Sequence, residues 1–279
     1  MLDIELLKPT EVEKAAVVFH RDDFVAINNA LTPVQLRYAQ AGARHVITEQ
    51  MEDIPPEKAN RGYARYSFGP QLHHPEWAQF IDLPTILPIL DEIWGRSDYI
   101  CSGGGGDYSV PGAKIQHLHS DIGDFFNDPL GQVTVRDVPT PYIVVNFPMV
   151  EFKEINGAIR FVPGTHRARH PIPPLAEEPE CMKRSIIGAP AGTAIIRDIR
   201  CWHGGTANNS DEIRPMTSVG YFAPWFRQPS LEPALPRALY ETLSPRGKTL
   251  CRFVVEPRAQ HLVPPVILAH PHLNRSEGC

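Results

Sequence analysis

Apolar and polar residues follow two different patterns along the chain, and the change comes near residue 99. Before it, helical spacing dominates. We expect a strand over 22–30, a helix over 33–51 that Thr32 caps, and two short helices within 75–95. After it, short apolar runs alternate with Gly, Pro and Asn, which is typical of strands in a β-sandwich or barrel.

The expected strands of the second part are six short runs, at 98–103, 113–121, 140–150, 157–166, 192–205 and 214–223. The glycines Gly103 to Gly106 are interpreted as a flexible loop, because no GKS or GKT follows to make a phosphate cradle. The Pro-rich segment 166–188 is expected to be a long loop of the kind that often forms a lid. The tail after Arg258 is expected to wrap the surface.

Size and composition indicate one large domain, because 279 residues with 42% hydrophobic content can bury a substantial core. The net charge of -5 and the scattered Lys and Arg leave no footprint for nucleic acid or an anionic membrane. The N-terminus has no signal-peptide pattern, and no run reaches the roughly 18 apolar residues of a membrane helix. We therefore expect a soluble, cytoplasmic protein.

The five cysteines are odd in number and far apart, so free thiols are expected rather than a disulfide framework or a CxxC zinc site. Nothing in the sequence fixes the oligomeric state, and a homodimer stays open.

The stretch QHLHSD concentrates groups that bind metals. In a strand, side chains alternate, so His117, His119 and Asp121 would share one face. The HxD pair of His119 and Asp121 needs one further histidine to complete the two-histidine, one-carboxylate arrangement that leaves three positions of Fe(II) open. His203 lies 82 positions after Asp121 and offers that ligand. Arg214 follows eleven positions after His203, and its planar guanidinium could bind a carboxylate.

Several neighbouring residues allow two interpretations. His117 shares the face of His119 and is a second candidate ligand, although HxD with Asp121 selects His119. His166 is interpreted as a turn residue near the pocket, and Asn146 faces either substrate or core. These three, His117, His166 and Asn146, are candidates for the pocket wall.

Longer motifs around these positions resemble the phytanoyl-CoA dioxygenase family of non-haem iron, 2-oxoglutarate-dependent oxygenases. NGAIRFVPGTHR (156–167) resembles its NGxLxxxPGSH stretch, and AGTAIIRDIRCWHGG (191–205) resembles the strand that leads into its second histidine. NNSDEIRPMTSVGYF (208–222) matches its NxSxxxR turn and strand. FVAINNALTPVQL (24–36) resembles its opening strand and helix.

The resemblance implies a mainly β fold with flanking helices (α+β), whose core is a double-stranded β-helix, the cupin-like jelly roll. It predicts one domain over 1–279, with a helix-rich part over about 1–98, the core over about 99–225 and a C-terminal extension over about 226–279. It implies that His119, Asp121 and His203 bind iron and that Arg214 binds the distal carboxylate of 2-oxoglutarate. Thr193 and Gln116 are further candidate contacts of that cosubstrate.

The resemblance also implies chemistry. The family uses Fe(II), 2-oxoglutarate and O2 to oxidise a small-molecule substrate, releasing succinate and CO2. Asp121 stands where related halogenases have a small residue, so oxygenation, with hydroxylation as the first choice, is expected rather than halogenation. Desaturation, epoxidation and ring rearrangement stay open. The only basic cluster for the phosphates of an acyl-CoA is RARH (167–170), which favours a natural-product intermediate as substrate. An acyl-CoA hydroxylase, a zinc-dependent hydrolase and a non-catalytic cupin-like binding module stay as alternatives, and neither of the last two requires Arg214.

Overall fold

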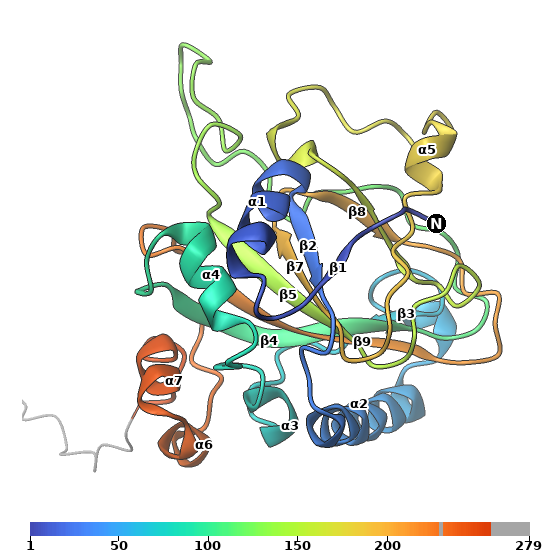
Figure 1. Ribbon diagram of the computed structural model, residues 1–279. Coiled ribbons are helices and arrows are strands. Elements are labelled where there is room, and N and C mark those ends of the chain that lie inside the picture. Colours follow the sequence, from blue (N-terminus) through green and yellow to red (C-terminus); the bar gives the residue numbers. More distant parts are fainter. Residues whose placement is uncertain (229–230, 258–279) are drawn as a thin grey trace, which may run out of the picture.

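The computed structural model describes residues 1–228 and 231–257. Its larger sheet has seven strands in the order β1-β2-β7-β5-β9-β4-β3 (Figure 1). All neighbours in it are antiparallel except β1 and β2. The strands are β1 (Leu6–Leu7), β2 (Phe24–Ile27), β3 (Arg65–Ser67), β4 (Ile100–Ser109), β5 (Tyr142–Pro148), β7 (Ala194–Asp198) and β9 (Arg214–Phe222).

A smaller antiparallel sheet, β6 (Ile159–Val162) with β8 (Trp202–Gly205), forms the second layer. Irregular segments extend it on both sides. His119 forms a β-bridge with His203 of β8, and the backbone of Phe161 in β6 donates to Ser185. Two facing antiparallel layers make up the expected double-stranded β-helix.

Helices lie outside the larger sheet (Figure 1). Its outward side chains, among them Ile143, Val145 and Val219, share one core cluster with helical residues, while Tyr142 and Val144 point the other way, into the space between the sheets. The α-helices are α1 (Val12–Asp22), α2 (Pro33–Asp53), α3 (Pro75–Ala78), α4 (Leu87–Trp94), α5 (Glu180–Lys183), α6 (Arg237–Thr242) and α7 (Pro245–Leu250), and the 3-10 turns are η1 (Pro56–Lys58) and η2 (Thr165–Arg167).

The local signals read from the first hundred residues are confirmed. Helix α2 begins at Pro33, and Thr32 caps it in a full capping box with Gln35. The expected strand of 22–30 is β2, and the two short helices are α3 and α4.

The division into three parts is blurred in the structure. The N-terminal part supplies three strands of the larger sheet, and its strand β2 pairs with β7 of the core part. The C-terminal part packs Leu235, Leu250 and Val254 into the main core. The prediction that the tail after Arg258 wraps the surface concerns residues 258–279, which lie outside the described residues.

The interpretation of Gly103 to Gly106 as a flexible loop is wrong, because all four lie in the middle of β4. Two of them sit against backbone. A Cβ on Gly105 would come within 3.0 Å of the Gly69 carbonyl, and one on Gly106 would strike the Met216 carbonyl. Tertiary crowding, and not turn formation, accounts for glycine here.

The expected strand over 113–121 is also wrong, since the segment is irregular apart from the bridge at His119. The long loop 166–188 is more ordered than expected. It carries η2 and α5 and bonds to β6, and none of its residues lines either of the two cavities described below.

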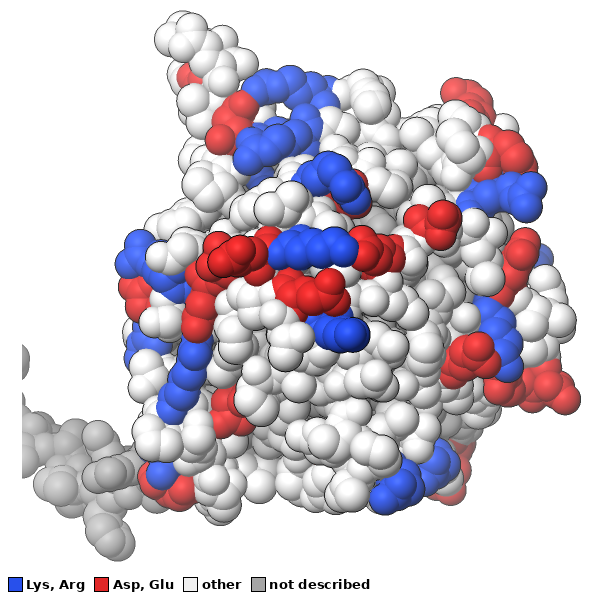
Figure 2. Space-filling view, in the orientation of Figure 1, with Lys and Arg blue, Asp and Glu red and all other residues white. Residues whose placement is uncertain are grey.

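Charged side chains of both signs are interleaved on the face drawn in Figure 2, without a broad basic patch. No helix in the described part of the chain is long and apolar enough to cross a membrane. The four described cysteines are free thiols, as expected, and Cys279 lies outside the described residues.

Candidate metal site and the cavity around it

Three predicted ligands converge between the sheets. His119 and Asp121 come from the irregular segment beside β8, and His203 comes from β8 itself. One ligand atom of each lies within 4.8 Å of the others. His119 Nε2 is 3.7 Å from Asp121 Oδ1, and His203 Nε2 is 3.4 Å from Asp121 Oδ2. Ligands about 2.1 Å from one ion at right angles lie about 3 Å apart, so small rotations would complete a triad.

Hydrogen bonds to backbone carbonyls orient both imidazoles. Nδ1 of His203 is 2.9 Å from the Cys201 carbonyl, and Nδ1 of His119 is 3.3 Å from the His117 carbonyl. A carbonyl only accepts, so these contacts place the proton on each Nδ1 and leave each Nε2 a free lone pair toward Asp121. Arg197 Nη1, a donor, lies farther from Nδ1 of His203, at 3.3 Å, so the shorter carbonyl contact decides the tautomer. This is the tautomer that a metal ligand needs.

Arg197, on β7, was missed by the sequence analysis. Its buried guanidinium donates to Asp121 Oδ2 at 2.8 Å, which leaves Oδ1 free on the side of His119. A charged residue inside the apolar strand run AIIRDIRCW was the signal that could have pointed to it. Arg197 thus fixes the orientation of the carboxylate from outside the triad.

The charges of the cluster favour metal binding. Burial lowers the pKa of His119 to about 4, helped by the neighbouring His203, so its imidazole is neutral at neutral pH. Burial alone would raise the pKa of Asp121, but His203 and Arg197 outweigh it and hold that pKa well below its usual range. The site therefore offers neutral nitrogen and an ionised oxygen.

A buried ion pair holds the ligand segment in place. Arg160 of β6 binds Glu178 at 2.5 Å, and both side chains are fully buried. Arg160 also donates to the Gln116 carbonyl at 2.7 Å, and Glu178 accepts from the backbone of Leu118 at 3.2 Å. Glu178, from the segment expected to be a lid, is thus an anchor for the residues around His119.

The triad lines a cavity of about 400 Å³ between the sheets. Arg214, the predicted carboxylate-binding group, lies in its wall and is 1% exposed. It donates to Asp107 at 2.8 Å and to the Gly157 carbonyl at 3.0 Å.

Arg65, a second buried arginine in the same wall, was also missed. It donates to the Thr206 carbonyl at 2.7 Å and has no carboxylate partner among the described residues. Burial, and then the nearby charge of Arg214, lower its pKa to about 10, so it stays charged at neutral pH. Two guanidinium groups thus face one carboxylate, Asp107, and a bound anion would balance the excess charge.

The HGG motif makes room for this arginine. A Cβ on Gly205 would fall closer than 3.0 Å to the Arg65 guanidinium, and one on Gly204 would lie 3.0 Å from the His117 carbonyl. The two glycines after His203 therefore let two chain segments approach β8.

Gln116 and Asn146 also line the cavity. Gln116 is fully engaged, since its Nε2 donates to the Arg61 carbonyl at 3.1 Å and its Oε1 accepts from the Gly205 backbone at 2.9 Å. Asn146 is 4% exposed, and its Oδ1 has no hydrogen-bond partner in the described part of the chain. Asn146 thus faces the cavity with polar capacity to spare, whereas Gln116 positions the wall.

The structure does not bring three other candidates into this cavity, since its lining contains neither Thr193, His117 nor His166. Thr193 is fully buried just before β7, and His117 is exposed with its ring 5.9 Å from that of His119. The expected roles of Thr193 at the cosubstrate and of His117 and His166 at the substrate gain no support from these positions.

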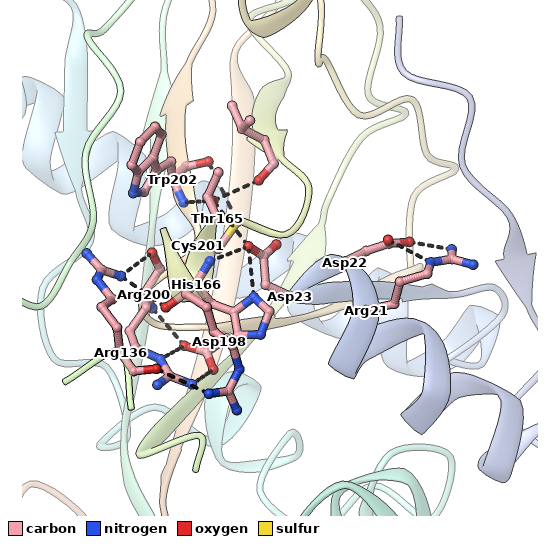
Figure 3. A network of polar contacts seen from close by, with 12 residues as sticks. Arg21, Asp22, Asp23, Arg136, Thr165, His166, Asp198, Arg200, Cys201 and Trp202 are labelled. Atoms are coloured by element: carbon pink, nitrogen blue, oxygen red, sulfur yellow. Dashed lines mark hydrogen bonds and ion pairs between the residues drawn. The ribbon is translucent and has the colours of Figure 1, made fainter. Parts of the chain in front are cut away.

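His166 belongs instead to a buried polar network at the base of β8 (Figure 3). Asp23 accepts from the His166 backbone at 2.9 Å and from the Thr165 hydroxyl at 3.1 Å, and that hydroxyl accepts from the Trp202 backbone at 2.9 Å. The PGTH turn therefore joins the end of α1 to the start of β8 and so positions His203.

The fold and this site define a class: jelly-roll proteins with a two-histidine, one-carboxylate triad between their sheets. The model of one family, phytanoyl-CoA dioxygenase (PhyH), matches residues 19–216, which include the triad and Arg214. The chain belongs to the phytanoyl-CoA dioxygenase (PhyH) family, as the sequence motifs suggested.

Curated relatives are more distant. Dioxygenase trt7 of Aspergillus terreus is 29% identical over 60% of this chain and 57% of its own length. The iron/alpha-ketoglutarate-dependent dioxygenase okaE of Penicillium ochrochloron is 27% identical over 56% of this chain and 50% of its own. The chain thus spans about half the length of the curated relatives it matches.

Solved structures support the fold. The epimerase SnoN, in complex with Fe3+, alpha ketoglutarate and nogalamycin RO, aligns with a TM-score of 0.59 over 77% of this chain and 84% of its own, at 17% identity. HygX from Streptomyces hygroscopicus, with nickel, 2-oxoglutarate and hygromycin B bound, aligns with a TM-score of 0.57 over 76% of this chain and 88% of its own, at 14% identity. The predicted α+β fold with a double-stranded β-helix core is confirmed.

Proposed function

We propose that this protein is an Fe(II)- and 2-oxoglutarate-dependent dioxygenase that hydroxylates an unactivated carbon of a small-molecule natural product. The observation that carries the proposal is the convergence of His119, Asp121 and His203 beside a wall with two buried arginines. Family membership supports the same activity, and the structural relatives SnoN, from nogalamycin biosynthesis, and HygX, bound to hygromycin B, support the substrate class.

The donor set fits Fe(II), because one carboxylate and two imidazoles on one side leave three positions for other ligands. Iron in this site supplies the one-electron and oxygen chemistry that protein side chains lack. His119 and His203 bind through Nε2 and Asp121 through the oxygen that Arg197 leaves free. Arg197 keeps that oxygen aimed at the site.

The wall fits a dicarboxylate. Arg214, aided by Arg65, binds the distal carboxylate of 2-oxoglutarate and so holds the cosubstrate in one orientation with its keto acid end toward the triad. A zinc hydrolase with the same three ligands has no use for two buried guanidinium groups around one aspartate, and neither has a binding module without turnover. Arg65 thus adds to the reason for preferring the oxygenase.

Succinate formation tests the proposal. Purified protein with Fe(II), 2-oxoglutarate and O2 should release succinate slowly even without its substrate, and His119→Ala, Asp121→Ala and His203→Ala should abolish that release because each removes a ligand. His117→Ala is the matched control, since its side chain lies outside the cavity, and it should retain the wild-type rate. Succinate release at the wild-type rate in any ligand variant would contradict the assignment.

A further inference from the structure

A second cavity of about 590 Å³ adjoins the one that holds the triad. Six residues line both: Arg61, Ser67, Tyr142, Val144, Ser218 and Gln228. The volume falls in the range of about 300–1,000 Å³ typical of small-molecule sites. With iron and 2-oxoglutarate in the first cavity, a substrate carbon can approach them from the second.

Four glycines of β4 and β9, Gly103, Gly104, Gly105 and Gly220, line the sheet side of this second cavity. Gly103 of β4 pairs with Gly220 of β9, and Val144 of β5 follows on the same row, which ends at Arg197 beside the triad. A Cβ on Gly103 would meet nothing within 4 Å, whereas a Cβ on Gly220 would lie 2.5 Å from the hydroxyls of Ser102 and Tyr142. The face of Gly103 is thus open toward the cavity and leaves a hollow there, while the Ser102 and Tyr142 side chains cover Gly220 and border this hollow.

The walls around the hollow are largely uncharged. Arg61 and Glu232 are the charged residues among the described lining, and their signs are opposite. The apolar members are Pro70, Leu72, Val144, Phe222, Leu231, Pro233 and Ala234. A single arginine, opposed by Glu232, cannot neutralise the several phosphate charges of a coenzyme A ester, which argues against the acyl-CoA alternative.

We propose that this cavity binds an uncharged, flat ring system of the substrate, lying on the backbone of Gly103 beside the side chains of Ser102 and Tyr142, and that the small residues Ser102 and Gly103 determine specificity. Peptide groups without side chains offer a surface on which a ring can lie close to the sheet. The row from Gly103 to Arg197 then leads the edge of the ring toward the triad. The inference rests on the proposed function and names the substrate class for the same site.

The test compares two fluorescent probes that share one ring system. N-phenyl-1-naphthylamine is uncharged, and 8-anilino-1-naphthalenesulfonate carries a sulfonate. Each is titrated under argon into the full chain loaded with Fe(II) and 2-oxoglutarate. We expect saturable binding of the uncharged probe, at least tenfold tighter than that of the sulfonate.

Ser102→Phe fills the hollow, because Ser102 lines the second cavity but not the first. It should weaken binding of the uncharged probe at least tenfold, whereas Ser97→Phe, the same change at an exposed residue, should leave it unchanged. No saturable binding to the wild type, equal binding of both probes, or equal binding to wild type and Ser102→Phe would each overturn the inference. A wild type that fails to bind 2-oxoglutarate would instead contradict the proposed function, whichever way the probes behave.

Discussion

At the scale of residues, the balance of charge around Asp107 is the feature most open to test. Arg65→Met and Arg214→Met each remove a guanidinium at similar volume, so each should weaken 2-oxoglutarate binding, the latter by about 2 to 5 kcal/mol as for a broken buried charge pair. The measurement is the visible absorption of the Fe(II)–2-oxoglutarate complex, titrated without oxygen. Arg44→Met, at an exposed position of α2, is the control, and wild-type affinity in both cavity variants would refute the assignment of the anion site.

The candidate ligands could be predicted from the sequence, but the arginines that orient and complete the site could not. His119, Asp121, His203 and Arg214 stand in or beside short motifs that resemble those of the family, within the range that the family model matches. Arg197 and Arg65 have partners 76 and 141 positions away, and only tertiary folding brings those together. An arginine in an apolar strand indicates burial with a partner, but it does not say which partner.

At the scale of elements, β8 and β3 touch through Gly205 and Arg65. Gly205→Ala should push the guanidinium away from the cavity, because the added methyl group would overlap it. We expect weaker 2-oxoglutarate binding in Gly205→Ala, and a double variant with Arg65→Met that is no weaker than Arg65→Met alone, since contacting residues are not additive. Gly123→Ala, where a Cβ meets nothing within 4 Å, is the control. Fully additive losses would show that the two residues act separately.

The network at the base of β8 predicts a pH effect on stability. Burial raises the pKa of Asp23 above 3.8, although its hydrogen bond with His166 opposes the shift. Between 3.8 and the raised pKa, the folded protein holds a proton that the unfolded chain releases, so the contribution of Asp23 to stability falls as pH rises.

Asp23→Asn should remove this slope, because an amide has no proton to lose there, while its oxygen can still accept from Thr165 and His166. The measurement is the free energy of unfolding from urea titrations, taken from pH 4 upward. The value for Asp23→Asn minus the value for the wild type should increase as pH rises. A difference between wild type and variant that stays constant with pH would contradict the raised pKa.

Elements were predictable where local signals decide them, as at Thr32 and α2. Elements whose conformation depends on long-range contacts could not be predicted from the sequence. Four consecutive glycines favour a loop by propensity, yet pairing with β9 holds Gly103 to Gly106 in a strand. The segment 113–121 alternates like a strand but is held by Arg160 and Glu178 rather than by a ladder.

At the scale of the whole molecule, helices stabilise one face of the larger sheet and leave the other free for chemistry (Figure 1). The fold class was predictable from the motifs of the family. The pairing of β2 with β7 was not, because no local pattern tells which distant strand an N-terminal strand joins. For the same reason the sequence did not reveal the second cavity, whose walls come from four separate stretches, within 61–72, 102–105, 142–144 and 218–234.

The central claim is that one ferrous ion sits between His119, Asp121 and His203. Crystals grown without oxygen in Fe(II) and 2-oxoglutarate test it most directly, by anomalous scattering at the iron absorption edge. The account predicts one strong peak about 2.0 to 2.2 Å from both Nε2 atoms and one Asp121 oxygen, with a carboxylate of 2-oxoglutarate against Arg214. Iron bound elsewhere, or Asp121 turned wholly to Arg197 with no metal beside it, would contradict the account.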